Sequence, residues 1–173
     1  MDGFPGRVEV PGRPGLVLRR LEEDDWPIEL ALARTADVPT WTMYPADLDE
    51  DGARLRATRN VRAADAGHGI RYVVEQDGEA LGTAGFGRSA EGFELFYALL
   101  PAGRGRGLIT AAVEAMAAWL RAQGEPLVRL STLDGNTASE AVAERAGFRR
   151  ERTGTHVDGR PLTVWLLPLG THE

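Results

Sequence analysis

One stretch, from Phe93 to Leu120, limits what this chain can fold into more than any other. It opens with apolar and aromatic residues over 93–100, and a loop with glycines at every second position from Gly103 follows. From Leu108 onward, apolar residues recur on one helical face, at Ile109, Ala112, Val113, Met116, Ala117 and Leu120. The stretch therefore predicts a strand, a glycine-rich turn and an amphipathic helix in direct succession.

The glycine-rich turn has the chemistry of an anion site. Glycine lets the backbone turn tightly with its N–H groups inward, and the N-terminus of the next helix adds partial positive charge. Arg104 and Arg106 add two cations, so we expect a phosphate-bearing ligand. The turn is not a Walker A motif, because no Gly-Lys-Ser/Thr follows. It is not a dinucleotide fingerprint either, because Leu108 stands where the third glycine belongs.

The same turn resembles the pyrophosphate loop of GNAT acyltransferases, whose pattern is Gln/Arg-x-x-Gly-x-Gly/Ala. Gly105 and Gly107 match the two small positions, and Ala102 takes the first position, a departure that the Rim-type branch tolerates. A second stretch is similar to the family's Asn-x-x-Ser…Gly-Phe helix, with its matches at Asn136, Ser139, Gly147 and Phe148. The likeness runs from Leu16 to Leu167, and the chain is identified as a member of the GNAT superfamily, nearest its Rim-type branch.

The resemblance implies acetyl-CoA as the cosubstrate. Its pyrophosphate would lie on the backbone of the loop and first helical turn, at Arg104, Gly105, Arg106, Gly107, Leu108, Ile109 and Thr110. Leu99 matches the position whose main chain holds the pantetheine arm, where family members splay two strands. Asn136 and Ser139 match the helix positions that contact the cofactor. A helix N-cap is the structural alternative for Asn136.

Acyl transfer to an amine needs a base for the ammonium and a proton donor for the departing thiolate. Glu94 matches the family's strand carboxylate, the expected base, and a solvent-facing strand edge is the alternative. Ser139 is the expected acid and Tyr97 the second candidate, with a position in the core or groove as the alternative for Tyr97. Three residues match one wall of the acceptor groove and are candidate substrate contacts, with core packing as the alternative: Trp41, Met43 and Tyr44.

The last strand departs from the family pattern. It carries Trp165 where relatives commonly carry a tyrosine, and the segment from Thr153 to Val157 looks shortened. His156 is a candidate to compensate, and simple exposure is the alternative for a lone loop histidine.

Composition narrows the function classes. The 173 residues contain no cysteine, which excludes a cysteine nucleophile and thiolate metal sites. His68, His156 and His172 lack the spacing of a metal site, so no metal is expected. The net charge of −6 argues against nucleic acid as partner. No apolar run approaches the ~20 residues of a membrane span, and no signal peptide is visible. We expect a cytoplasmic protein without a membrane partner.

The chain reads as one domain. We expect residues 1–15 to form an extended or flexible N-terminal arm and residues 16–173 to form a single acyltransferase domain. A helix is expected from about Asp49 to Ala64, with Leu55 and Val61 inward. The expected strands are 16–21, 70–75, 80–86, 93–100, 127–131, 148–151 and 162–167. The predicted class is α/β (α+β), a mixed, mostly antiparallel sheet with helices on both faces.

These expectations converge on an N-acetyltransferase that moves an acetyl group from acetyl-CoA to a primary amine. Direct transfer in a ternary complex is favoured, because the chain has no cysteine to hold the acyl group. The acceptor is a protein N-terminus or a small amine. An aminoglycoside- or polyamine-type enzyme is an alternative that the acidic stretch around Asp47 would suit equally. A non-catalytic acyl-CoA-binding regulator is the other. The oligomeric state, a homodimer included, stays open.

Overall fold

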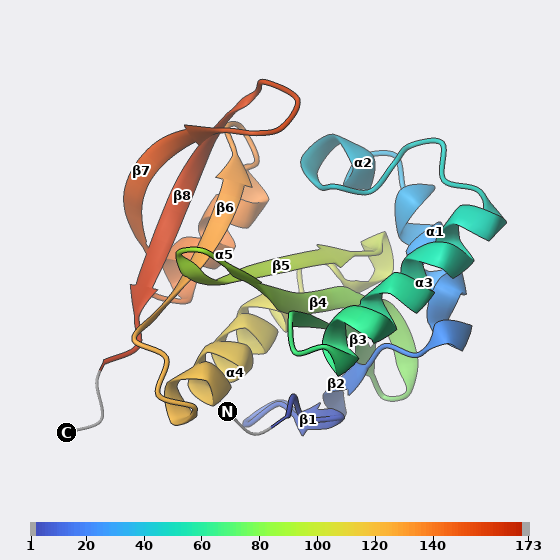
Figure 1. Ribbon diagram of the computed structural model, residues 1–173, viewed down its shortest axis with the longest axis horizontal. Helices are drawn as coiled ribbons and strands as arrows, with labels where there is room; N and C mark the ends of the chain where they lie inside the picture. The colour runs from blue at the N-terminus through green and yellow to red at the C-terminus, as the bar shows by residue number, and fades with distance from the viewer. Residues whose placement is uncertain (1–2, 171–173) are drawn as a thin grey trace.

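The computed structural model describes residues 3–170, which fold around one mixed sheet (Figure 1). The strand order is β1-β2-β3-β4-β5-β6-β8-β7. Within these residues, all neighbouring strands pair antiparallel except β5 and β6, which confirms the predicted mixed sheet. The strands are β1 Arg7–Glu9, β2 Leu16–Arg20, β3 Gly69–Gln76, β4 Glu79–Ser89, β5 Gly92–Leu99, β6 Leu127–Leu133, β7 Arg149–Thr155 and β8 Pro161–Pro168.

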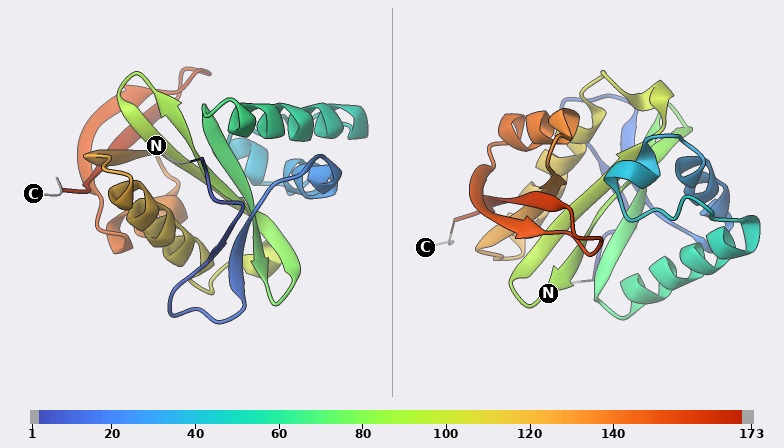
Figure 2. Two further views of the ribbon diagram at one scale, coloured as in Figure 1. Left: turned by 60° about the horizontal axis from the view of Figure 1, so that its bottom comes forward. Right: turned by 90° about the horizontal axis from the view of Figure 1, so that it is seen from above.

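Helices cover both faces of the sheet, as predicted (Figure 2). One face carries α4 and α5, and the other carries α1, α2 and α3. The helices are α1 Trp26–Ala33, α2 Val38–Trp41, α3 Glu50–Asp65, α4 Leu108–Ala122 and α5 Thr137–Arg145. None of the helices described is long and apolar enough to cross a bilayer.

Each face of the sheet has its own core, because side chains along a strand alternate between the two faces. Under α4, Phe86 and Phe93 pack edge to face, with ring centroids 5.3 Å apart. All six residues predicted on the inner face of α4 are buried. On the other side of the sheet, Val73 and Ala98 pack against α1 and α3. The strand–turn–helix prediction is therefore confirmed in both its elements and its buried face.

The inward face of α3 differs from the prediction. Leu55 is 52% exposed, so its expected inward position is wrong. Ala53 and Ala57 are fully buried instead, one turn apart on the side that meets α1. Small side chains therefore occupy the face of α3 that packs against α1.

The N-terminal segment lies along the sheet edge. Residues 7–9 form β1 and pair with β2, and the ring of Phe4 lies 5.5 Å from that of Phe86. The extended part of the predicted arm is thus a strand in the structure. Residues 1–2 of that arm and the C-terminal residues 171–173, His172 among them, lie outside the described residues.

The candidate site lies at the junction between β5 and β6. These two strands pair in parallel at three residue pairs, which join Phe93–Leu95 to Val128–Leu130. Beyond them β5 continues to Leu99 and β6 to Leu133 with no further pairing between the two. Figure 1 shows β6, β8 and β7 turning away from β5.

Candidate active site

Two cavities adjoin where β5 and β6 separate. One, of about 590 Å³, is lined by residues that include Glu94, Phe96 and Ser131, and we call it the Glu94 cavity. The other, of about 660 Å³, runs along the glycine loop and the start of α5, and we call it the loop cavity. The residues that line both are Trp41, Thr42, Tyr97, Asn136 and Ser139. A molecule in each cavity would therefore meet the other at these side chains.

The glycine loop has the shape that an anion site requires. Gly105 and Gly107 both have φ of +71°, in the left-handed region that favours glycine. Gly107 is the N-cap of α4, whose first N–H groups lack intrahelical partners. A Cβ on Gly105 would meet no atom within 4 Å, whereas a Cβ on Gly107 would lie 2.5 Å from Nη2 of Arg13, so the loop is open at Gly105. The loop can hold a phosphate on its N–H groups.

The predicted loop residues separate into two groups. Those that line the loop cavity are Arg104, Gly105, Gly107, Leu108, Ile109 and Thr110. Arg106 does not line it. Its carbonyl oxygen instead accepts a hydrogen bond from Arg13 of the N-terminal segment, whose guanidinium also donates to the carbonyl of Gly107. Arg13 thus ties the described part of the N-terminal segment to the loop, a contact that no local pattern in the sequence predicts.

Arg104 is engaged within the protein. Its guanidinium donates to both carboxylate oxygens of Asp37, at 2.8 and 2.9 Å, and to the carbonyl oxygen of Leu99, at 3.0 Å. The hydrogen bonds from Arg104 lower the pKa of Asp37. Asp37 therefore offsets part of the positive charge that Arg104 brings to the loop. A ligand that pairs with the carbonyl of Leu99 would have to displace this guanidinium.

The first turn of α5 brings together two of the predicted catalytic residues. The hydroxyl of Ser139 lies 2.6 Å from that of Tyr97, and either oxygen can be the donor. Burial raises the pKa of Tyr97 to about 12, although the hydrogen bond to Ser139 acts in the opposite direction. The phenol is therefore protonated at neutral pH, and the pair can pass a proton toward an atom at the junction of the cavities. Asn136 caps α5 by accepting from the backbone N–H of Ser139, which confirms the N-cap alternative, and it also lines both cavities. Its contact with the cofactor stays a prediction.

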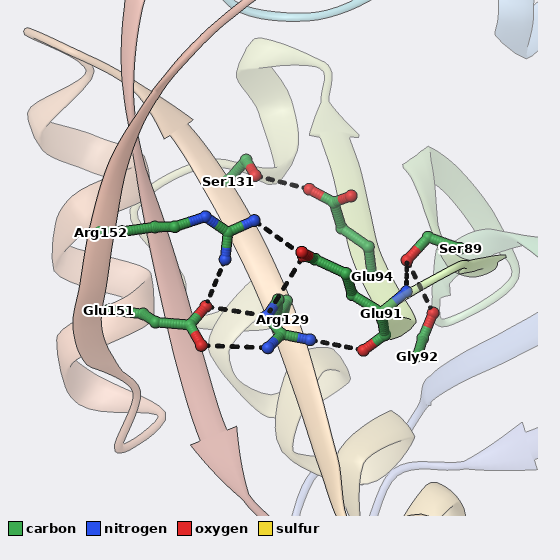
Figure 3. Close-up of polar contacts among 8 residues, drawn as sticks. All are labelled: Ser89, Glu91, Gly92, Glu94, Arg129, Ser131, Glu151 and Arg152. Carbon is green, nitrogen blue, oxygen red and sulfur yellow. Dashed lines mark hydrogen bonds and ion pairs between the residues drawn. The ribbon is translucent and has the colours of Figure 1, made fainter.

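Glu94 points from β5 into the Glu94 cavity and is only partly exposed. The hydroxyl of Ser131, on β6, donates to its carboxylate at 2.5 Å (Figure 3). Sequence reasoning missed Ser131. No sequence signal singled it out, because Thr132 and Arg129 are also polar residues of β6 and only the parallel register with β5 brings Ser131 to Glu94. The hydrogen bond fixes the direction of a carboxylate that can accept a proton in the cavity.

A separate ion network lies beside this pair (Figure 3). Arg129 on β6 donates to the carboxylate of Glu151 at 2.8 and 3.0 Å and to the carbonyl oxygen of Glu91. Arg152 joins Glu151 to Glu91 from the other side. The network fastens the β4–β5 turn to β6 and β7 at the end where β5 and β6 still pair.

Of the three residues predicted to form the acceptor wall, two line a cavity with exposed surface and the third is buried. Trp41 lines both cavities, and Met43, 60% exposed, lines the Glu94 cavity. Tyr44 also borders the Glu94 cavity but is buried, and its hydroxyl bonds to Thr83 at 3.0 Å. Asp47 lines neither cavity.

The β7–β8 hairpin closes part of the Glu94 cavity. The imidazole of His156 contacts the sulfur of Met43 at 3.1 Å, and Arg160 donates to the carbonyl oxygen of Thr40. His156 thus lies in the lining rather than in open solvent. Trp165 is fully buried and donates to Thr132 at 2.8 Å, so it replaces the family's tyrosine as a core residue and not as a cavity residue. In the described part of the chain, no three metal-ligating side chains gather.

Comparisons with known proteins identify what shares this architecture. The sequence model of the family described as "Acetyltransferase (GNAT) domain" matches residues 15–149. Comparison with curated protein sequences gives no significant match. Among solved structures, RimL, the ribosomal L7/L12 alpha-N-protein acetyltransferase in complex with coenzyme A, is 19% identical, with a TM-score of 0.82 over 92% of this chain and 97% of its own.

Two further structures have the same fold. The microcin C7 self-immunity acetyltransferase MccE, in complex with acetyl-CoA and AMP, is 15% identical, with a TM-score of 0.83 over 95% of this chain and 97% of its own. Mycobacterium smegmatis RimJ, in complex with CoA-disulfide, is 22% identical, with a TM-score of 0.80 over 96% of this chain and 88% of its own.

Proposed function

The chain belongs to the GNAT acetyltransferase family, and we propose that it transfers an acetyl group directly from acetyl-CoA to a primary amine. One observation carries the proposal. Tyr97 and Ser139 line both cavities, whereas Glu94 lines only one. A candidate base for the amine thus lies in one cavity, and a candidate proton donor for the leaving sulfur lies where the two cavities adjoin.

The loop cavity fits acetyl-CoA by two features of its own. The open space over Gly105 leaves room for a pyrophosphate on the N–H groups of the loop and α4. The half of β5 beyond Leu95 has no pairing partner on its β6 side, so its main chain can pair with the amides of an extended arm. The coenzyme A and acetyl-CoA in the structures of RimL and MccE support the assignment. Acetyl-CoA would supply the acetyl group as an activated thioester.

The residues of the Glu94 cavity would prepare the amine. Glu94, held by Ser131, accepts a proton from the ammonium, which frees the lone pair that must attack. Tyr97 and Ser139 hold a proton at the junction and donate it toward the sulfur as negative charge develops there. Direct transfer needs no covalent acyl-enzyme, in keeping with a chain that has no cysteine. We also propose a cytoplasmic location, since acetyl-CoA is a metabolite of the cell interior.

The test is a screen of small amines and N-terminal peptides with acetyl-CoA, in which a thiol reagent detects free coenzyme A. The absence of cysteine keeps the protein's own background at zero. Initial velocities at varied concentrations of both substrates should give intersecting lines, because both must be bound before transfer. Parallel lines would indicate a covalent acyl-enzyme and overturn direct transfer. Tight acetyl-CoA binding without turnover of any amine would favour a non-catalytic acyl-CoA-binding regulator.

A further inference from the structure

A buried carboxylate lies behind the Glu94 cavity with two arginines around it. Glu29 on α1 is 0% exposed. Its Oε2 accepts a hydrogen bond from Nε of Arg56 at 2.5 Å, and its Oε1 lies 3.5 Å from Nε of Arg71 without a hydrogen bond. Both arginines line the Glu94 cavity, whereas Glu29 does not. One carboxylate therefore faces two guanidinium groups, which leaves an excess of one positive charge at the cavity wall.

Among the described residues, Arg56 and Arg71 form no ion pair other than those with Glu29, so none offsets this excess. The ring of Tyr44 lies between the arginines, 4.3 Å from the guanidinium carbon of Arg56 and 5.7 Å from that of Arg71. Burial raises the pKa of Tyr44, so its phenol stays neutral. Thr83 and Tyr44 bond to Nη1 of Arg71 as uncharged partners. Glu94 is the one carboxylate among the described residues that line the cavity.

The arginines also retain unused donors. Arg71 binds its protein partners through Nη1, and in the described part of the chain its Nη2 has no hydrogen bond and is not among the buried polar atoms. Within the same residues, Arg56 uses only Nε, for Glu29. Two planar guanidinium groups with free N–H donors on a cavity wall match the oxygens of a carboxylate or a phosphate.

The two arginines lie close enough to Glu94 for one small molecule to reach both. The guanidinium carbon of Arg71 lies 4.5 Å from the centroid of the Phe96 ring. Phe96 and Glu94 are two residues apart on β5, so they share one face about 7 Å apart along the strand. An ammonium at Glu94 and an anion at Arg71 and Arg56 can therefore belong to one molecule.

We propose that the acceptor is an amine that carries an anionic group, a carboxylate or a phosphate, which Arg71 and Arg56 bind while Glu94 receives the ammonium. This inference rests on the proposed function, because it specifies the substrate class of the same cavity. It disfavours polyamines and aminoglycosides, whose additional cations would meet the uncompensated guanidinium charge.

The test compares matched pairs of amines for binding to the protein saturated with coenzyme A, so that binding is measured without chemistry. The carboxylate arm pairs ω-amino acids, from β-alanine to 6-aminohexanoate, with their amides. The phosphate arm pairs O-phosphoethanolamine with ethanolamine. Calorimetry should show at least tenfold tighter binding of the anionic member in one arm, and the better arm identifies the anion. Equal affinities within every pair, or no binding by any anionic member, would overturn the inference.

Arg71→Met should reduce the preference to near unity, and Arg71→Lys should restore part of it. In both variants Arg56 still pairs with Glu29. Arg54→Met is the matched control, because Arg54 lies on the same helix as Arg56, pairs with Glu50 and lines neither cavity. Acetyl-CoA affinity should stay unchanged in all three variants, and Arg54→Met should also keep the wild-type melting temperature. Arg71→Met should melt at a lower temperature, because the buried carboxylate of Glu29 loses one of its two cations and Tyr44 and Thr83 lose a donor. A preference that survives Arg71→Met in folded protein contradicts the inference.

Turnover of the same compounds separates this inference from the proposed function. If amines are acetylated without regard to their anionic group, the substrate class is wrong and the acetyltransferase stands. If anionic amines bind selectively and none is acetylated, the anion site stands and the catalytic proposal fails.

Discussion

Gly87 on β4 lies directly opposite Glu94 on β5 in the ladder that joins the two strands. A Cβ at position 87 would meet no atom within 4 Å, and Gly87 lines the Glu94 cavity. The absence of a side chain at position 87 therefore leaves cavity space beside the carboxylate of Glu94. Its neighbour Gly85 differs, because a Cβ there would overlap the carbonyl oxygen of Ile70 and the ring of Phe96.

This contrast gives the first prediction. Gly87→Val should fill cavity space next to Glu94 and raise the KM for the amine by roughly tenfold, with no loss of stability, since β-branched residues suit strands. Acetyl-CoA affinity should not change, because Gly87 does not line the loop cavity. The matched control is Gly85→Ala, which should lower the melting temperature. An unchanged amine KM in Gly87→Val would place the acceptor elsewhere.

Glu94→Gln tests the base. The amide keeps the shape of the side chain but cannot take the proton, so kcat should fall by roughly 10²-fold or more. Acetyl-CoA affinity should stay nearly constant, and the loss should shrink as pH rises because more of the amine is already free. A loss that is the same at every pH would mean a structural role for Glu94.

Ser131→Ala tests how the base is held. Without the hydroxyl, the carboxylate of Glu94 loses the hydrogen bond that fixes its direction. We expect a fall in kcat of roughly tenfold, about the value of one hydrogen bond to a charged group. In the Glu94→Gln background the same change should have much less effect, since the group it orients is gone. Equal losses in both backgrounds would show that Ser131 acts independently of Glu94.

Ser139→Ala and Tyr97→Phe test the proton donor. Each should lower kcat more than it weakens acetyl-CoA binding, because donation strengthens as charge develops on the sulfur. The two hydroxyls form one hydrogen-bonded pair, so the double variant should lose much less than the two single losses combined. Melting temperatures measured on the same proteins separate catalysis from helix capping. If kcat of Ser139→Ala stays within twofold of wild type, Tyr97 alone remains as the acid.

The pKa of Tyr97 gives a prediction on stability at high pH. A tyrosine with a folded pKa of about 12 and an unfolded value near 10 favours folding fully below pH 10, and this contribution is lost as pH rises toward 12. The melting temperature of wild type should therefore fall more steeply between pH 10 and pH 12 than that of Tyr97→Phe. Ser139→Ala, which keeps the phenol, should follow wild type. Parallel curves for wild type and Tyr97→Phe would show that the buried phenol has no such role.

The glycine loop can be tested for charge separately from backbone strain. Gly105 has φ of +71°, a conformation that Asp and Asn tolerate better than other residues do. Gly105→Asp adds a negative charge over the loop, and Gly105→Asn adds the same bulk without it. We expect acetyl-CoA affinity to fall at least about tenfold further in the aspartate variant, about 1.4 kcal/mol. Equal affinities in the two variants would remove the pyrophosphate from this loop.

Local patterns were enough to predict much of this molecule. The α4 face followed from the spacing of its apolar residues, and the strands followed from short apolar runs between glycine and proline turns. The match of Glu94, Tyr97 and Ser139 to one family pattern came from motif spacing, and the structure brings these residues to adjoining cavities. The roles assigned to them remain predictions.

What the sequence did not reveal depends on contacts between distant segments. Ser131 meets Glu94 only through the parallel register of β5 and β6, and Arg13 meets the glycine loop across more than ninety residues. The environment of Glu29 requires α1, α3 and β3 to converge, which no periodicity encodes. Leu55 was misplaced for a similar reason, because the packing of α1, and not hydrophobicity alone, selects the inward face of α3.

The sheet is one sheet only by virtue of three residue pairs between β5 and β6. Beyond them, strands β1–β5 and strands β6–β8 form two plates that diverge from this short shared edge, and the core under α4 contacts both plates. Each cavity has β5 on one side and β6, or the residues directly after it, on the other. The opening angle between the plates therefore sets the width of both cavities together. A substitution at the β5–β6 pairs that changed this angle would therefore alter both cavities at once.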